Sequence, residues 1–286
     1  MATLKEIKVR IGAVKNTQKI TKAMRMVAAA KLRRAQDRMI SARPYARKIN
    51  ELLTHLVSAS ETVKNPLMER REGATLVVVV TSDRGLCGSF NTNLLKVAGN
   101  HIKRLGAGTK VVCVGKKGFD FFKSRNVDLY EKYLGVFNNL NVEASNEIVN
   151  RIVDGYMKRE YGKVEIIYNE FKSVVKQEIR IEQFLPIVSK DTDGKKAKNL
   201  YYIYEPDMES ILNTLIPRQL KIQFWKALLE SNASEQGARM TAMETASRNA
   251  TDLIKSLEIE YNRARQEAIT KEILEIVGGA EALKEA

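Results

Sequence analysis

The sequence is poor in the residue types that build metal centres, disulfide frameworks and sharp chain breaks. Its 286 residues include two cysteines, two histidines, one tryptophan and five prolines. Two cysteines do not make a disulfide framework, and Cys87 and Cys113 each lie in or beside an apolar strand pattern, which favours buried free thiols in a reducing compartment. His55 and His101 have no clustered partner ligands, so we expect no metal site.

Long apolar runs are also missing. No stretch approaches the ~18 to 20 consecutive apolar residues that a membrane-spanning helix needs, and the N-terminus lacks the apolar core of a signal peptide. We therefore expect a soluble protein that is not exported.

Acidic residues are scarce in one segment only. The whole chain has 48 basic and 34 acidic residues, a formal net charge of +14. Most of that excess lies in residues 1–60, where fourteen lysines and arginines face only three acidic residues, whereas residues 207–286 hold ten basic and thirteen acidic ones. Such an imbalance indicates an anionic partner for the first segment. Aromatic side chains for base stacking are nearly absent there, which leaves an acidic protein surface open as the partner.

The first sixty residues also carry a sustained heptad pattern, which predicts one long helix in a coiled coil. Gln18, Thr21 and Arg25 are the only positions of the frame that are not apolar. Pro44 should bend the helix without necessarily ending it. The frame consists of Leu4, Ile7, Ile11, Val14, Gln18, Thr21, Arg25, Ala28, Leu32, Ala35, Met39, Ala42, Ala46, Ile49, Leu53 and Leu56.

Residues 73–205 have a different pattern, in which strands and helices alternate. Strand-like runs are "ATLVVVV", "KVVCVG", "KVEIIYNEF", "VVKQEIRIEQFLP" and "LYYIYEP", and helical patterns occupy about 92–105, 116–125 and 143–160. This alternation predicts an α/β layer with partly parallel pairing. The polar stretch "SKDTDGKKAKN", residues 189–199, is the best candidate for a mobile loop.

The first strand of this segment ends in a glycine-containing turn, "TSDRGLCGSFN". Its glycines are three residues apart and no lysine follows them, so it matches neither of the two common phosphate-binding loops. We expect a tight structural turn in which Gly85 and Gly88 supply unusual φ angles and Asn91 or Thr92 caps the next helix.

Helix is predicted again from Asp207 onward. Met243, Ala246, Ala250, Leu253 and Leu257 alternate by three and four, so this helix can bury its stripe against the N-terminal one as an antiparallel pair. Matching the two frames predicts a register that pairs Leu4 with Tyr261, Ile7 with Leu257, Ile11 with Leu253, and Val14 with Ala250. Beyond Tyr261 the C-terminal helix would continue unpaired.

Four stretches of the sequence carry a resemblance to a known family: the N-terminal "LKEIKVRIGAVKNTQKITKAMRMVAAAKLRRAQDRM", the C-terminal stretch from "SEQGARMTAMETASRNA" to "EIVGGAEAL", and between them "TSDRGLCGSFN" and "YIYEPD". Through these stretches the chain resembles the gamma subunit of the F-type ATP synthase in its bacterial form. The resemblance implies a fold in which terminal helices 1–60 and 207–286 form an antiparallel coiled-coil shaft. A central Rossmann-like α/β domain, residues 73–205, is inserted between them.

The function implied by the resemblance is that of a rotor with no catalytic site, cofactor or metal of its own. In the family, the shaft turns inside a ring of alpha and beta subunits, and its foot rests on the c-ring beside the epsilon subunit at the cytoplasmic face of the bacterial membrane. Family positions that contact the beta subunits correspond to Met24, Cys87, Arg265 and Gln266, with Lys31, Arg33 and Arg34 as candidates for an acidic beta-subunit loop. Tyr204 and Glu205 correspond to the loop on the c-ring.

Two other functions are compatible with parts of the pattern. A basic coiled-coil protein could bind nucleic acid, with a steep salt dependence and without other subunits. An α/β enzyme could use the residue 75–95 turn to bind a nucleotide, which would require ATP binding by the isolated chain.

Overall fold

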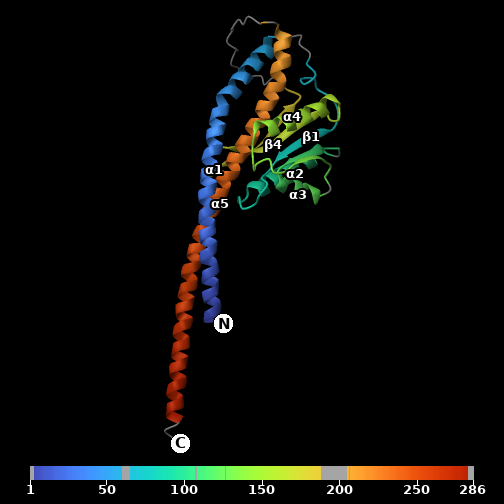
Figure 1. Cartoon of the computed structure of the whole chain (residues 1–286). Coiled ribbons are helices and arrows are strands. Elements are labelled where there is room, and N and C mark those ends of the chain that lie inside the picture. Colours follow the sequence, from blue (N-terminus) through green and yellow to red (C-terminus); the bar gives the residue numbers. More distant parts are fainter. Residues whose placement is uncertain are drawn as a thin grey trace. The chain divides into compact units, whose positions relative to one another are not determined.

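The computed structural model describes residues 3–59, 65–106, 108–125, 127–187, 205 and 207–282 (Figure 1). In the sequence, one long helix precedes the segment that forms the sheet and another follows it, as expected for this fold class. The elements are α1 (Leu4–Ala59), β1 (Thr75–Val80), α2 (Phe90–Leu105), β2 (Lys110–Val114), α3 (Lys116–Lys123), β3 (Leu129–Tyr133), α4 (Val142–Met157), β4 (Lys163–Phe171), β5 (Gln177–Leu185) and α5 (Met208–Ala282).

Five strands form one mixed sheet in the order β3-β2-β1-β4-β5. β1 pairs in parallel with both β2 and β4, β2 pairs in parallel with β3, and only β5 runs antiparallel to its neighbour. The valine run of β1 is central in this order and Leu76–Val80 are fully buried, because a parallel strand covered on both faces needs apolar side chains on both. The expected α/β layer is therefore confirmed. The short edge strand β3 was not predicted, and the expected strand "LYYIYEP" and the 189–199 loop lie outside the described residues.

The described chain divides into two compact units. Met1–Val27 and Met240–Ala286 form the coiled-coil unit, and Ala28–Arg239 form the sheet unit. Both long helices contribute to both units, since α1 continues from Val27 to Ala28 and α5 from Arg239 to Met240 across the unit boundary. Pro44 and Pro217 lie within the helices and do not end them. Within the described residues, no helix is long and apolar enough to cross a membrane.

The heptad frame of α1 is confirmed by burial in both units. Every predicted frame position from Leu4 to Leu56 is buried or half-buried. Their neighbours on the outer side, such as Val9 and Ile40, are exposed although they are apolar. The 3.5-residue repeat, and not hydrophobicity alone, therefore decided which side chains of this helix are covered.

The frame of α5 was predicted only in part. Met243, Ala250 and Leu257 are buried as expected, but Leu253 is 41% exposed and its neighbour Ile254 is 8% exposed. The adjacent leucine and isoleucine are both apolar, so the sequence could not decide which one faces the seam. The heptad positions of α5 that face the seam therefore include Ile254 and not Leu253.

The predicted register between the two helices is wrong by about one helical turn. In the coiled-coil unit, Gln18 donates from Nε2 to Thr251 Oγ1 at 2.7 Å, and Arg25 forms an ion pair with Glu244. Both contacts step by seven residues along each helix in opposite directions, as an antiparallel heptad pairing requires. Figure 1 shows the two segments of this unit side by side. Continuing that step places Ile11 near Glu258 instead of Leu253. The polar contacts, which the apolar pattern does not contain, set this register.

The corrected frame predicts different stability effects for two adjacent substitutions. We expect Ile254→Ala to lower the free energy of unfolding by about 2–4 kcal/mol, because it leaves a cavity in the seam. Leu253→Ala should cost less than about 1 kcal/mol, since that residue is 41% exposed and its removal leaves no closed cavity. Urea unfolding followed by circular dichroism at 222 nm measures both. A larger loss for Leu253→Ala than for Ile254→Ala would restore the register read from the sequence.

Candidate functional site

The turn between β1 and α2, residues 81–91, is held by a compact set of side-chain hydrogen bonds. The Asn91 side chain accepts from Ser82 N at 3.1 Å and donates to Ser82 Oγ at 2.7 Å and to Cys87 Sγ at 3.2 Å. Ser82 Oγ in turn donates to the Arg84 carbonyl at 2.7 Å. Asn91 therefore closes the turn on itself and does not cap α2. That helix begins at Phe90 after Ser89, which makes no side-chain cap.

Asp83 ties the turn to the two neighbouring loops at the carboxyl edge of the sheet. Its Oδ1 accepts from Lys116 N at 3.0 Å and from Gly135 N at 2.9 Å. Gly115 has φ +100°, and a Cβ there would lie 2.2 Å from the Thr81 carbonyl oxygen, so only glycine fits this close approach. Ligands of open α/β sheets bind at this edge. Here the carboxylate of Asp83 already uses the backbone N–H groups that an anion would need.

The left-handed backbone positions of the turn are Leu86 and Gly88, with φ angles of 63° and 57°. Gly85, which was expected to supply one of them, does not have a positive φ. For a residue with a Cβ, this conformation costs about 1–2 kcal/mol. Leu86 is also 64% exposed. The sequence analysis missed this residue because a leucine gives no signal for such a position.

Arg239 of α5 forms hydrogen bonds with the backbone in the middle of the turn. Its Nη2 donates to the carbonyl oxygens of Arg84 at 3.3 Å and Gly85 at 3.2 Å, while its Nη1 pairs with Glu235 Oε1 at 2.6 Å. Burial raises the pKa of the Glu235 carboxyl above its usual value, and the Arg239 guanidinium opposes that rise. The guanidinium thus donates to a buried carboxylate and to two backbone carbonyls at the same time, and these contacts hold the turn against α5.

Cys87 is a buried part of this turn. Its side chain is 2% exposed, and burial raises the pKa of the thiol, although the hydrogen bond with Ser82 acts in the opposite direction. The exposed side chains of the turn near Cys87 are those of Arg84, Leu86 and Ser89. Contact with a partner through this turn would consequently use exposed side chains such as these and not the thiol.

The basic residues Lys31, Arg33 and Arg34, which we call the α1 basic patch, are all exposed. They surround the buried seam residue Leu32, and the charge of Lys31 acts on Glu235 to lower its pKa. The α1 basic patch and the 81–91 turn therefore both lie near the Glu235–Arg239 part of α5 in the sheet unit.

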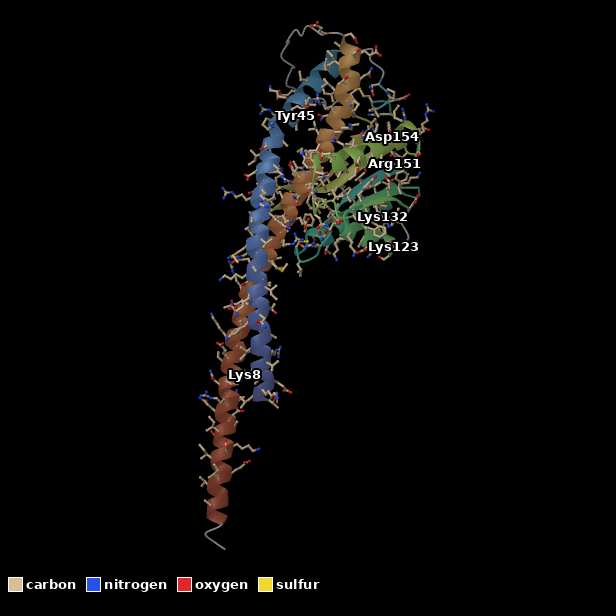
Figure 2. The ribbon with its side chains drawn as sticks, in the orientation of Figure 1. Lys8, Tyr45, Lys123, Lys132, Arg151 and Asp154 are labelled. Carbon is tan, nitrogen blue, oxygen red and sulfur yellow. The ribbon has the colours of Figure 1, made fainter. Side chains whose placement is uncertain are left out.

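Other bases of the sheet unit have aromatic partners. Figure 2 labels Lys123 of α3 and Lys132 of β3, and both ammonium groups lie over the Phe119 ring, 5.7 and 4.8 Å from its centroid. Arg125 lies over Phe121 at 3.6 Å. These cations are already stabilised within the chain by the rings they cover, which distinguishes them from the α1 basic patch.

Met24, Arg265 and Gln266 belong to the coiled-coil unit. Met24 is half-buried, and Arg265 and Gln266 are exposed. Met24 precedes Arg25, whose partner Glu244 lies about 30 Å along α5 from Arg265 at the rise of a helix. The structure therefore places Met24 and the Arg265–Gln266 pair at two separate levels of this unit.

The predicted foot residues are described only in part. Glu205 is exposed just before α5, whereas Tyr204 lies outside the described residues. The sheet unit also has a groove of about 1320 Å³ along residues 39–53 of α1 and 218–230 of α5. Its lining includes the bases Arg43, Arg47, Lys48, Arg218, Lys221 and Lys226. Among the described residues, no group of three or more His, Cys, Asp or Glu side chains could hold a metal ion.

Comparison with known proteins covers the full chain. The family model described as ATP synthase matches residues 3–283. The ATP synthase gamma chain of Chloroherpeton thalassium is 51% identical over 304 residues, with 100% of both chains covered. The ATP synthase gamma chain of Geotalea uraniireducens is 46% identical, with 99% of this chain and 100% of the relative covered.

Solved structures agree with these relatives. A chain in the central stalk and c-ring of the Tetrahymena thermophila mitochondrial ATP synthase matches with a TM-score of 0.62 and 26% identity, covering 80% of this chain and 99% of that one. A chain in the Euglena gracilis mitochondrial ATP synthase matches at 20% identity with a TM-score of 0.69, over 98% and 94% of the two chains, and supports the fold. From end to end, in sequence and in architecture, the protein belongs to the gamma chain family of the ATP synthases.

Proposed function

We propose that the chain is the central rotor shaft of an ATP synthase, coupling proton-driven rotation of a c-ring to ATP synthesis, and to hydrolysis in reverse, at beta-subunit sites. The observation that carries this proposal is the full-length match to ATP synthase gamma chains. In this proposal residues 1–60 and 207–286 form the shaft and residues 73–205 the globular domain. The chain itself contributes no catalytic site, cofactor or metal.

The apolar end of α5 supports the presence of a surrounding ring. Ile269, Ile273, Leu274, Ile276 and Val277 are all exposed, each by 46% or more. This segment follows Ala264, the last half-buried position of the seam, and Arg265–Ala282 is about 25 Å long at the rise of a helix. So many large apolar side chains on one exposed helix indicate a protein interface. Alpha and beta subunits would supply that sleeve, with Arg265 and Gln266 at its entrance.

Torque would pass through charged contacts as well as apolar ones. The α1 basic patch and Met24 are the proposed contacts with beta subunits. The 81–91 turn that contains Cys87 would approach the same subunits. At the foot, Tyr204 and Glu205 would meet the c-ring, and the groove along residues 39–53 and 218–230, which is lined by six bases and three glutamates, would receive the epsilon subunit or the ring. The chain would thus be held at the cytoplasmic face of a bacterial membrane only through its complex.

Rotation is the direct test of this function. We expect the chain, mixed with alpha and beta subunits of a related synthase, to form a complex that hydrolyses ATP in sustained turnover. A bead tethered to the sheet unit should rotate in one direction when ATP is added. A bead tethered to an alpha subunit serves as the control and should not rotate relative to the beta subunits. Steady ATP turnover with a stationary bead on the chain would contradict the rotor function.

The α1 basic patch should matter through its charge. We expect Lys31, Arg33 and Arg34, all changed to Gln, to leave the circular dichroism and melting temperature of the chain nearly unchanged but to weaken coupling between ATP hydrolysis and proton pumping. Single substitutions should have little effect, because exposed charges contribute about 0–1 kcal/mol each. Proton pumping per ATP hydrolysed, measured in vesicles at several salt concentrations, gives the result. The matched control changes three exposed bases of the sheet unit, Lys103, Arg104 and Lys158, to Gln. Equal coupling in both triple variants would show that the patch is only solvated.

A further inference from the structure

We propose that Leu86 is a contact residue of the rotor whose conformation is fixed before binding, and that it inserts into an apolar pocket bordered by carboxylates on a subunit of the catalytic ring. Arg239 is the residue that positions Leu86. This inference rests on the rotor function proposed above. It goes further by assigning the contact of the 81–91 turn to Leu86 in place of Cys87, and by assigning a role to a residue of α5 that reaches the turn.

The first observation is that Leu86 combines strain with exposure. Its φ of 63° lies in the left-handed region, where a bulky side chain is an outlier. A glycine would adopt this conformation freely, and glycines stand at positions 85 and 88 of the same turn. Leu86 buries little of its side chain in return, since it is 64% exposed. Strained residues of this kind mark functional contacts when the surrounding structure holds them in place.

The second observation is that the backbone beside Leu86 is fixed on both sides. Arg239 donates to the carbonyl oxygens of Arg84 and Gly85, and the carbonyl oxygen of Cys87 accepts from Phe90 N at 3.3 Å. A leucine on this fixed backbone is already oriented before a partner binds. Such preorganisation removes much of the ordering cost that a free loop would pay on binding.

The third observation gives the chemistry of the partner. Arg84, Lys116 and Lys117 are all exposed close to Leu86 in the turn or in the adjoining start of α3. The Cε of Lys117 lies 3.8 Å from the place where a Cβ on Gly85 would be. The neighbouring carboxylate of Asp83 faces inward, since its Oδ1 accepts from two backbone N–H groups and its Oδ2 is buried. A single apolar side chain beside cations that form no ion pair within the described part of the chain fits an apolar pocket with an acidic border.

Three substitutions at position 86 separate strain from contact. We expect Leu86→Gly to melt about 2–4 °C above Leu86→Ala in the isolated chain, because glycine relieves the left-handed strain and alanine keeps it. Both should nevertheless weaken binding of the chain to the ring of alpha and beta subunits about tenfold, which corresponds to one lost apolar anchor. Leu86→Met should keep the affinity within about threefold. Wild-type affinity in both Gly and Ala variants would overturn the proposal.

Photo-crosslinking tests the contact directly. A photoreactive amino acid at position 86 of the assembled complex should give adducts with a ring subunit, whereas the same group at Val175, which is 82% exposed in the turn between β4 and β5, should not. No adduct from position 86 in any nucleotide state would refute the contact. If the wild-type chain itself failed to rotate in the ring, the rotor function would fail instead, and the two failures are therefore distinguishable.

The positioning role of Arg239 predicts a separate effect. Arg239→Gln removes the charge and the two hydrogen bonds to the turn, and we expect it to lower the crosslinking yield from position 86 at least threefold. In the Arg239→Gln background, Leu86→Gly should still melt at a higher temperature than Leu86→Ala. Arg239→Lys keeps the pair with Glu235 but cannot hold both carbonyls, so it should rescue stability more than crosslinking. An unchanged crosslinking yield in both Arg239 variants would leave Leu86 without its positioning residue and overturn that half of the proposal.

Discussion

The structure depends on keeping one narrow apolar stripe of α1 away from water. This stripe recurs every 3.5 residues from Leu4 to Leu56, and each of its positions is at least half-buried. A helix of this length cannot cover its own stripe, so α5 must supply an apolar surface to match. Because α1 and α5 both extend through the coiled-coil unit and the sheet unit, the same constraint shapes both. Hydrophobic burial along the seam, rather than the charge of the outer face, is what makes a long helical pair stable.

The polar interruptions of the stripe have a structural purpose. Gln18 reaches Thr251 across the seam, Arg25 reaches Glu244, and Thr21 bonds back to the carbonyl of Gln18. Apolar side chains would pack acceptably in several registers, whereas the two contacts between the helices, Gln18–Thr251 and Arg25–Glu244, form in one register. Polar residues inside a coiled coil commonly set register at some cost in stability. A shaft that transmits torque needs such a fixed register, since slippage by one heptad would dissipate it.

In the sheet unit, polar contacts likewise fix the 81–91 turn in one arrangement. The loop after β1 is bonded through Asp83 to the loops that follow β2 and β3, and through Arg239 to α5. Its backbone is thereby fixed to both the sheet and a shaft helix. The turn resembles a phosphate loop only in its glycines, because its own carboxylate takes the backbone donors at this edge. What remains for partners is the exposed surface, which includes Arg84, Leu86 and the nearby lysines.

The sequence by itself determined the order of the elements apart from β3, the α1 seam and the family, because each depends on periodicity or on motifs that are local in the chain. Heptad spacing places Leu32 and Met39 inside without any knowledge of what covers them, and a run of valines is a buried strand in any parallel sheet. Tertiary structure alone decided between Leu253 and Ile254, the register of the helices and the left-handed conformation of Leu86. These features depend on contacts between residues far apart in the chain, such as Gln18 with Thr251 and Arg239 with Gly85. Such contacts leave no mark in local composition, since their energy comes from hydrogen bonds that exist only once the segments have met.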